Sequence, residues 1–390
     1  MKSQEKPLNK DRALKILTAL KRDQVNTTTV SYLHIGHNEF ISKFLRELEL
    51  TSRGDYFFKV INAPKGGGKT HLLTLSKQLA LKQGFAVSLL ETSWEDFLFK
   101  KEHNLYRKFI QNLQIGGITT REGHLATALK LWVDIADEKN YKLCPHGLKP
   151  FSCSFPSCKL PPEFTSLKED LKTALRILRD EWKYKREINS PLILDWLNGV
   201  KVPLKNLRSI GIKERIDRGN ALEYIGEIVK LLTLIDYRGV VLAIDDDNEK
   251  LTEDGLKELL RINYRLSFST YLYFIYATPV HFAHLLLQNL TKSGREEYEL
   301  FSLFKRIPSS KEIKEAIDSI IYYIDTLTRE EMEELVEKLI KIHTLSNNKK
   351  LNSNDYQKIF VELIPNAHNL HLTPGNFLKE VLSILLEREY

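Results

Sequence analysis

A glycine-rich stretch carries the most specific chemistry in the chain. Residues 63–70 read APKGGGKT, which matches the phosphate-binding pattern G-x-x-x-x-G-K-[ST] except that Ala63 replaces the first glycine. The three glycines allow backbone N–H groups to turn toward phosphate oxygens without Cβ clashes. The position of Ala63 requires a small side chain more than it requires a positive φ. The stretch therefore predicts a site for a nucleoside triphosphate, with ATP and Mg²⁺ as the expected cofactors.

The two residues after the glycines supply functional side chains. Lys69 is expected to reach the β- and γ-phosphates, and the hydroxyl of Thr70 to ligate Mg²⁺. A chance Lys-Thr pair after a glycine-rich turn is the alternative, but the stretch lies between an apolar run and a helical pattern, whose N-terminus favours phosphate charge. The predicted nucleotide-binding set is Ala63, Pro64, Lys65, Gly66, Gly67, Gly68, Lys69, Thr70, His71 and Asp245.

Three acids follow a second apolar run, VVLAIDDD at residues 240–247. Asp245 is assigned to Mg²⁺ and Asp246 to the base that activates water. The register could slip by one residue, which would give Asp246 and Asp247, and a solvated turn is a further alternative. A glutamate would extend the carboxylate by about one C–C bond, roughly 1.5 Å. Aspartate at the base position therefore favours slow hydrolysis.

Thr278 ends the next apolar run, at residues 271–278. Its hydroxyl could contact the γ-phosphate or the attacking water, or it could simply be the last residue of a strand. The predicted catalytic set is Lys69, Asp246 and Thr278.

All three cysteines fall in one proline-rich segment. Cys144, His146, Cys153 and Cys158 have the spacing C-x-H-x₆-C-x₄-C, and three thiolates with one imidazole form a closed tetrahedral set for a structural Zn²⁺. The segment has few apolar residues, so a metal would supply the missing folding energy. The alternatives are free thiols with an exposed His146, or a redox disulfide between Cys153 and Cys158.

Apolar periodicity predicts an α/β core with a mostly parallel sheet. The predicted strands are 56–63, 85–92, 239–247 and 271–278. The predicted helices are 11–22, 38–50 with Asn38 as N-cap, 70–84, 105–140, 166–186 and 221–234. After residue 308 we expect no strand and three helices, at 328–343, 355–364 and 373–387.

The composition sets wider limits. The chain has 390 residues, of which 42% are hydrophobic and 28% charged, as in folded proteins of several packed units. It contains no apolar run of about 18 residues, and its first residues lack the apolar stretch of a secretory signal, so we expect no membrane contact. Three cysteines fit a reducing, cytoplasmic setting. The net charge of +7 permits contact with nucleic acid without requiring it.

The order of these segments resembles AAA+ ATPases of the origin-recognition kind, and more closely the P-loop ATP-binding family of the BREX bacteriophage-resistance systems. The resemblance covers most of the chain apart from the cysteine-rich segment. Besides residues 63–85, it is carried by RALKILTAL (12–20), ILDWLNG (193–199), NALEYIGEIVKLLTLIDYRGVVLAIDDDNEKL (220–251), YFIYATPVHF (273–282), IDTLTREEMEELVEKLIKIH (324–343) and LTPGNFLKEVL (372–382).

The resemblance implies an AAA+ P-loop NTPase with a C-terminal helical lid. The expected units are N-terminal helices of the core (1–50), the nucleotide-binding core (51–140 and 187–307), the Cys/His insert with a helix (141–186) and the lid (308–390). The implied reaction is ATP hydrolysis to ADP and phosphate, slow or stimulated by a partner. The implied partners are further copies of the chain, other defence proteins and double-stranded DNA.

One departure from such families concerns the lid. Their last helix usually opens with Thr-Pro-Arg, and this arginine senses the γ-phosphate, whereas this chain reads Thr373-Pro374-Gly375. Either Lys379 substitutes one turn later, or nucleotide sensing is weakened. Together with Asp246, this departure keeps open a second function, a nucleotide-gated adaptor that hydrolyses ATP slowly or not at all.

Overall fold

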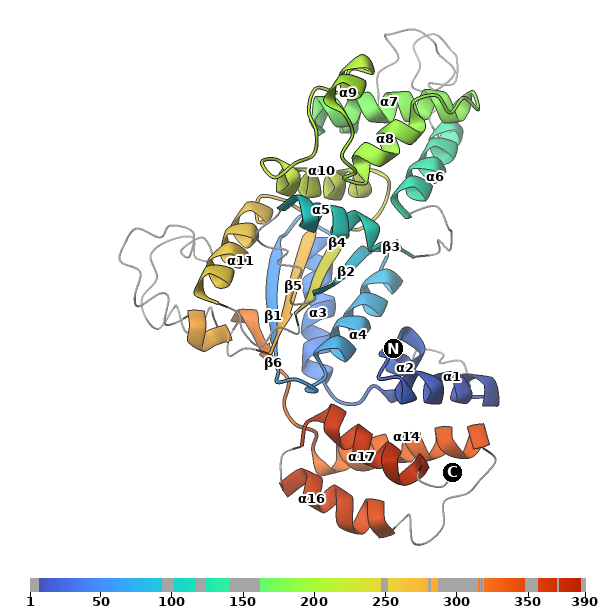
Figure 1. The fold of residues 1–390 in the computed structure, drawn as a ribbon, viewed down its shortest axis with the longest axis vertical. Coiled ribbons are helices and arrows are strands. Elements are labelled where there is room, and N and C mark those ends of the chain that lie inside the picture. Colours follow the sequence, from blue (N-terminus) through green and yellow to red (C-terminus); the bar gives the residue numbers. More distant parts are fainter. Residues whose placement is uncertain are drawn as a thin grey trace.

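In the computed structural model, the described residues are 7–92, 102–116, 124–139, 162–246, 252–279, 282–286, 315, 317, 319–347, 357–369 and 372–386. They form three regions along the long axis of the molecule (Figure 1). A sheet with its covering helices lies in the middle, helices of residues 124–209 lie at one end, and helices of residues 329–386 lie at the other.

The sheet has six strands in the order β3-β2-β4-β5-β1-β6. All neighbouring strands are parallel except β2 and β3. The four predicted apolar runs form β1, β2, β4 and β5, and the mostly parallel α/β core is confirmed. The strands are β1 (Phe57–Asn62), β2 (Ala86–Thr92), β3 (Leu113–Ile115), β4 (Val240–Asp246), β5 (Leu272–Thr278) and β6 (Ile321–Tyr323).

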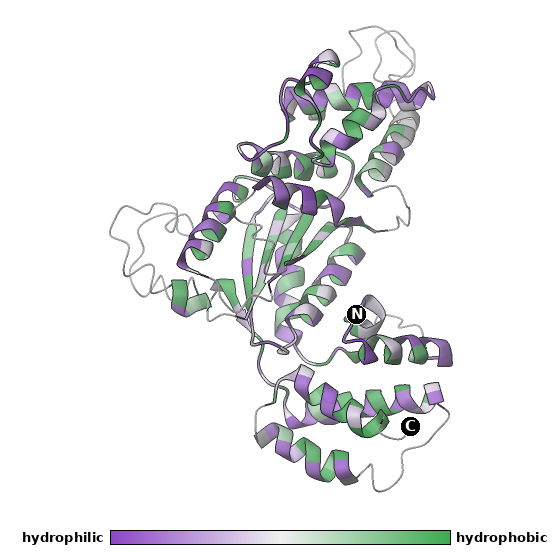
Figure 2. Ribbon diagram, in the orientation of Figure 1, coloured by the Kyte–Doolittle hydropathy of each residue, from purple (hydrophilic) through white to green (hydrophobic). Residues whose placement is uncertain are grey.

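Alternate residues of the central strands enter two different hydrophobic cores, because side chains of a strand point to opposite faces in turn. Val241 and Ala243 belong to one core and Leu242 and Ile244 to the other. Both faces are buried, which explains why the strands are almost wholly apolar (Figure 2). The first face is covered by α3 (Asn38–Thr51) and α4 (Lys69–Lys82), and the second by α5 (Glu102–Gln111), α10 (Ala221–Leu234) and α11 (Glu253–Leu266).

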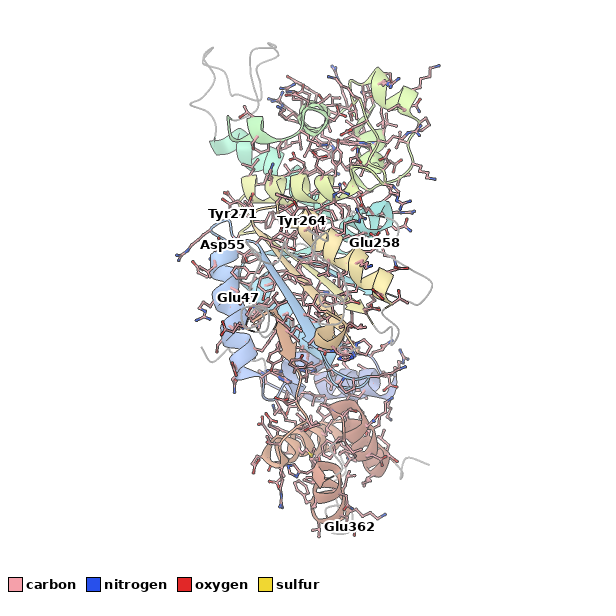
Figure 3. The ribbon with its side chains drawn as sticks, turned by 90° about the vertical axis from the view of Figure 1, so that its left-hand side faces the viewer. Glu47, Asp55, Glu258, Tyr264, Tyr271 and Glu362 are labelled. Atoms are coloured by element: carbon pink, nitrogen blue, oxygen red, sulfur yellow. The ribbon has the colours of Figure 1, made fainter. Side chains whose placement is uncertain are left out.

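A buried carboxylate ties α3 to the sheet. Glu47, labelled in Figure 3, accepts a hydrogen bond from the phenol of Tyr273 at 2.6 Å and pairs with the ammonium of Lys59 at 2.9 Å. A buried charge is tolerated when it is paired in this way. Because Lys59 lies on β1 and Tyr273 on β5, the contact fixes α3 against the two strands that lead into the glycine-rich loop and to Thr278.

The region at one end extends the second core. Trp196 is almost fully buried there, packs edge-on against Tyr224 with ring centroids 5.6 Å apart, and donates its indole N–H to the backbone of Glu214 at 3.1 Å. This region is therefore continuous with the core over the sheet. Its helices are α6 (His124–Lys139), α7 (Glu169–Lys183), α8 (Ser190–Leu197) and α9 (Leu204–Ser209).

Helices from both ends of the sequence share the third core, and we call this group the terminal cluster. Ile16 and Leu17 of the first helix pack with Val336, Phe377 and Val381. The helix at 27–33, α2, packs on α4. Residues 1–50 thus divide, because α3 packs on the sheet while the first helix packs with the C-terminal helices. The cluster comprises α1 (Lys10–Lys21), α14 (Arg329–Asn347), a π-helical segment (Gln357–Leu363), α16 (Ile364–Asn369) and α17 (Pro374–Leu386).

Two short strands correct the sequence predictions. β3 lies within the stretch 105–140 that was predicted as helix, and β6 lies beyond residue 308, where no strand was predicted. Each strand has three residues and pairs with a longer strand, β3 with β2 and β6 with β1. Such short pairings leave almost no periodicity in the sequence.

A third correction concerns the start of α3. Asn38 was predicted as the N-cap, but it is the first helical residue, and the N-cap position belongs to His37 in a left-handed conformation with φ of 57°. His37 gives no side-chain cap, because its ring instead contacts the hydroxyl of Tyr322 at 3.0 Å.

Candidate functional site

The glycine-rich loop connects β1 to α4, as predicted. Gly66 and Gly68 have φ of 78° and 96°, a left-handed conformation that side-chain-bearing residues rarely adopt. A Cβ added at Gly68 would meet no atom within 4 Å. The loop therefore leaves open space beside the N-terminus of α4, where a phosphate group would fit.

The structure explains why alanine is tolerated at the first position of the loop. A Cβ added at Gly67 would lie 2.8 Å from the Cβ of Ala63 and 2.9 Å from the carbonyl oxygen of Pro64. Ala63 is buried and does not adopt a positive φ. The position needs a small residue and no glycine, which confirms this part of the prediction.

Lys69 lies along the loop. Its side chain is buried, and the ammonium donates hydrogen bonds to the carbonyl oxygens of Ala63 and Pro64, each at 3.2 Å. The charge is thus held at the first turn of α4 beside the open space at Gly68. In this position it could attract the terminal phosphates of a nucleotide.

Thr70 and Asp245 are brought together as predicted. The hydroxyl of Thr70, on α4, donates a hydrogen bond to Oδ2 of Asp245, at the end of β4, at 2.6 Å. Asp245 lies on the same face of the sheet as Val241 and Ala243, which is the face that α4 covers. A hydroxyl and a carboxylate are the hard oxygen ligands that Mg²⁺ prefers, so these residues fit the expected metal.

Asp246 points to the other face of the sheet, since successive residues of a strand alternate. Its carboxylate accepts a hydrogen bond from the phenol of Tyr276, on β5, and both side chains are buried. Burial raises the pKa of Tyr276 well above its usual range, and the negative charge of Asp246 adds to this effect. The residue predicted as base is therefore held by a donor, while Asp247 lies outside the described residues.

Thr278 connects the strand end to the loop through its backbone. Its carbonyl oxygen accepts hydrogen bonds from the side-chain amide of Asn62 at 3.0 Å and from the backbone N–H of Ala63 at 3.3 Å. Thr278 is fully buried. Asn62 and Tyr276 were not singled out in the sequence. The available signal was a polar residue at the last position of the first apolar run, and a tyrosine two residues before Thr278.

His71 forms a stacked pair with His34, which precedes α3. Nδ1 of His34 lies 3.3 Å from Nε2 of His71, and the ring centroids are 5.6 Å apart. Burial lowers the pKa of His71 to about 3 and that of His34 to about 4, and in both cases a neighbouring histidine contributes. Both rings are therefore neutral at pH 7. The structure shows this pair where the sequence suggested a nucleotide contact for His71.

The start of α17 lies against the glycine-rich loop. The backbone N–H of Gly375 donates a hydrogen bond to the carbonyl oxygen of Gly66 at 2.8 Å, and the hydroxyl of Thr373 would lie 3.0 Å from a Cβ added at Gly66. A Cβ added at Gly375 would lie 2.9 Å from the carbonyl oxygen of Gly66. Steric contact with the loop therefore explains why this position holds glycine and not the expected arginine.

Lys379 does not take the place of that arginine in this arrangement. Its ammonium pairs with the carboxylate of Asp23, next to the end of α1, at 3.0 Å. Both side chains are more than half exposed. The lysine therefore lies on the outside of the terminal cluster.

The proposed zinc ligands, Cys144, His146, Cys153 and Cys158, lie outside the described residues. Within the described part of the chain, no group of three or more His, Cys, Asp or Glu side chains is arranged to hold a metal. The helices of the same part include none that is long and apolar enough to cross a membrane.

Comparison with known proteins identifies the family. A protein-family model described as BREX system ATP-binding protein BrxC/D matches residues 8–389. A search of curated proteins gives no match. The family match covers nearly the whole chain, so the chain belongs to the BREX system ATP-binding proteins, and the resemblance noted in the sequence is confirmed. Family membership indicates ATP binding and a role in BREX defence.

Proposed function

We propose that this BREX protein binds ATP with Mg²⁺ at the loop of residues 63–70 and works as an AAA+-type ATPase, a switch or motor that acts on DNA or on a partner complex. The contact between Thr70 and Asp245 carries this proposal, because it joins the helix after the loop to the acidic strand end. The open space at Gly68 and the buried ammonium of Lys69 support it.

In this proposal, different residues bind the phosphates, the metal ion and the attacking water. The backbone of the loop and Lys69 hold the phosphates, and Thr70 and Asp245 would hold the metal ion. When bound, Mg²⁺ neutralises charge on the phosphate oxygens. Asp246 accepts a proton from water, and Tyr276 keeps its carboxylate in one orientation. Thr278 lies at the same edge of the sheet, one strand away from Asp245.

A second function has its own support. A nucleotide-gated adaptor would bind ATP and hydrolyse it slowly or not at all. Asp246 is short for a base and already accepts a hydrogen bond from Tyr276, and Gly375 stands where related proteins place the sensing arginine. In this case ATP binding alone would change the contact between the loop and α17.

Turnover in Asp246→Asn separates the two functions. For an ATPase we expect unchanged affinity for a fluorescent ATP analogue and a loss of phosphate release of about 100-fold or more, because a general base contributes roughly 10²–10⁴-fold. Phosphate release at the wild-type rate would place the base elsewhere. A wild-type chain that binds the analogue but releases no phosphate, with or without partners, would support the adaptor.

The partner can be identified with the same assay. ATPase activity is measured with and without double-stranded DNA over a salt series, and the oligomeric state is measured by sedimentation with and without ATP. Stimulation that fades as salt rises would support direct contact with DNA phosphates. Absence of stimulation would favour a protein partner in the defence complex.

A structural zinc ion in the Cys/His segment is the last element of the proposed function. Metal analysis of protein purified without chelator should give about one zinc per chain if Cys144, His146, Cys153 and Cys158 close one site. Cys153→Ser should remove the zinc and leave ATP binding intact. If wild-type protein purified in this way contains no zinc, the proposed zinc site is wrong.

A further inference from the structure

A short segment at the end of α7 and the start of the turn that leads to α8 alternates aromatic and basic residues. It reads Trp182-Lys183-Tyr184-Lys185-Arg186, and it lies in the region farthest from the terminal cluster (Figure 1). Lys185 and Arg186 are exposed, and the side chain of Tyr184 is 49% exposed. An exposed aromatic ring flanked by cations is the arrangement that binds a base and its phosphates together.

The segment is held in one conformation by Glu181. This buried carboxylate accepts hydrogen bonds from the backbone N–H of Asn189 and of Ser190, from the amide of Asn189 and from the hydroxyl of Ser190, at 2.6–2.9 Å. The backbone N–H of Arg186 also donates to the carbonyl of Glu181 at 2.8 Å. A ligand at this turn would not have to order it, which lowers the entropic cost of binding.

A pocket of about 270 Å³ opens beside the turn and is lined by Lys130, Trp182, Lys185 and Glu187. The ammonium of Lys130 lies 5.7 Å from the centre of the Trp182 ring. Pockets for drug-sized ligands enclose roughly 300–1,000 Å³. This smaller pocket has room for one ring, and its lining offers an aromatic side chain, two cations and one carboxylate.

The pocket is lined by two cations, Lys130 and Lys185, and by one carboxylate, Glu187, so the charge of its lining is positive by one. Asp180 is paired with Arg179 at 2.7 Å, and the carboxylate of Glu181 is used by the turn itself. The guanidinium of Arg186 lies 5.8 Å from the centre of the Tyr184 ring. A cation therefore lies beside each aromatic ring, Lys130 at Trp182 and Arg186 at Tyr184, which favours an anionic ligand that also has flat, stacking groups.

We propose that the α7–α8 turn, which we define as residues 182–189, binds single-stranded nucleic acid, with one base in the pocket against Trp182, a neighbouring base on the exposed ring of Tyr184 and the adjacent phosphates on Lys185 and Arg186. A base in a paired duplex is stacked and cannot enter such a pocket, so the site selects single strands. An acidic peptide would satisfy the cations but not the aromatic wall. The site lies apart from the ATP loop and does not depend on ATP hydrolysis.

The test uses the full-length chain without nucleotide and fluorescently labelled 20-mers of single-stranded DNA, single-stranded RNA and the matching DNA duplex. Affinity is measured by fluorescence anisotropy from 50 to 200 mM salt. We expect tighter binding of a single strand than of the duplex. The double variant Lys185→Glu with Arg186→Glu should bind single strands at least about tenfold more weakly, with the slope of log affinity against log salt reduced by about 1.4, or 0.7 for each lost phosphate contact.

Two further variants make the result specific. Lys201→Glu with Lys205→Glu changes the net charge equally at exposed positions of the same region, and its affinity should match that of the wild type. Tyr184→Ala should weaken binding about five- to tenfold without changing the salt slope, because it removes stacking and no charge. Analogue binding at the ATP loop should stay the same in all variants, which separates this site from the proposed ATPase.

Several outcomes would overturn the assignment. One is a wild-type chain that binds no single strand at 50 mM salt. Another is a Lys185/Arg186 variant that binds like the Lys201/Lys205 control. If the chain binds duplex and single strand with equal affinity and Tyr184→Ala does not change that affinity, the binding is a general attraction to phosphates. If polyglutamate of equal charge displaces the oligonucleotide, the surface binds an acidic protein partner.

Discussion

Two helices begin at the glycine-rich loop, and they reach it in different ways. α4 continues directly from the loop, and the residues that start it, from Gly66 to Thr70, are neighbours in sequence. α17 comes from the opposite end of the chain and contacts the loop only through folding, by the hydrogen bond from Gly375 to Gly66. The connection of α4 to the loop can be read from a sequence motif, whereas the contact of α17 with the loop depends on the packing of the whole terminal cluster.

The difference assigns different tasks to the two contacts. The α4 side carries the ammonium of Lys69, the hydroxyl of Thr70 and the backbone N–H groups of the helix start, which are the kinds of group that bind phosphate. The α17 side presents only backbone and small side chains. It would therefore move when the loop moves, but it adds no charge to the site. Gly66 takes part in both, so a shift of the loop backbone at this residue would act directly on the start of α17.

Lys69→Ala is expected to have the largest effect, because it removes the buried cation of the proposed phosphate site. We expect affinity for a fluorescent ATP analogue to fall by about 100-fold or more, as for loss of a charge-assisted contact of roughly 3 kcal/mol. Lys82→Ala is the matched control, since Lys82 is exposed in the last turn of α4, outside the predicted nucleotide-binding set, and its loss should change affinity little. Unchanged affinity in Lys69→Ala would show that the residues at the start of α4 do not hold the nucleotide through this charge.

Gly375→Ala is expected to have an intermediate effect. The added Cβ would lie 2.9 Å from a backbone oxygen, so α17 must move away from the loop. We expect a loss of stability of about 1–3 kcal/mol, measured by denaturant unfolding, and a shift in ATP affinity of a few-fold. Gly219→Ala, where the nearest atom would lie at 3.5 Å, should be close to neutral.

The same position sharpens the comparison further. If Gly375→Arg restored tight nucleotide sensing without loss of stability, the missing arginine would be the important feature and the contact with Gly66 would be incidental. If Gly375→Arg destabilises at least as much as Gly375→Ala, the steric explanation stands.

Lys379→Ala is expected to have the smallest effect. Its ion pair with Asp23 is exposed, and such pairs contribute about 0–1 kcal/mol. We expect ATP affinity to stay at the wild-type level and the unfolding midpoint to shift slightly. A clear drop in ATP affinity would mean that Lys379 leaves Asp23 when nucleotide binds and does act as the sensor.

The sequence predicted the features that depend on neighbouring residues. The loop, its strand and helix, and the acids at the end of β4 could be read from glycines, a Lys-Thr pair and apolar runs. It did not predict β6 or the contact of Gly375 with Gly66, since both depend on surfaces that exist only after the sheet has formed. Asp245 and Asp246 are intermediate, because their sequence is plain but their opposite directions follow only from the strand.

The terminal cluster also has a consequence for synthesis of the chain. α1 is translated well before α14 and α17, yet Ile16 and Leu17 pack with residues of both. While the sheet is being made, α2 is the native neighbour that α1 already has, and the larger part of its core is still missing. Contacts so distant in sequence form slowly, so α1 completes its packing only after the sheet and α14 and α17 have been made.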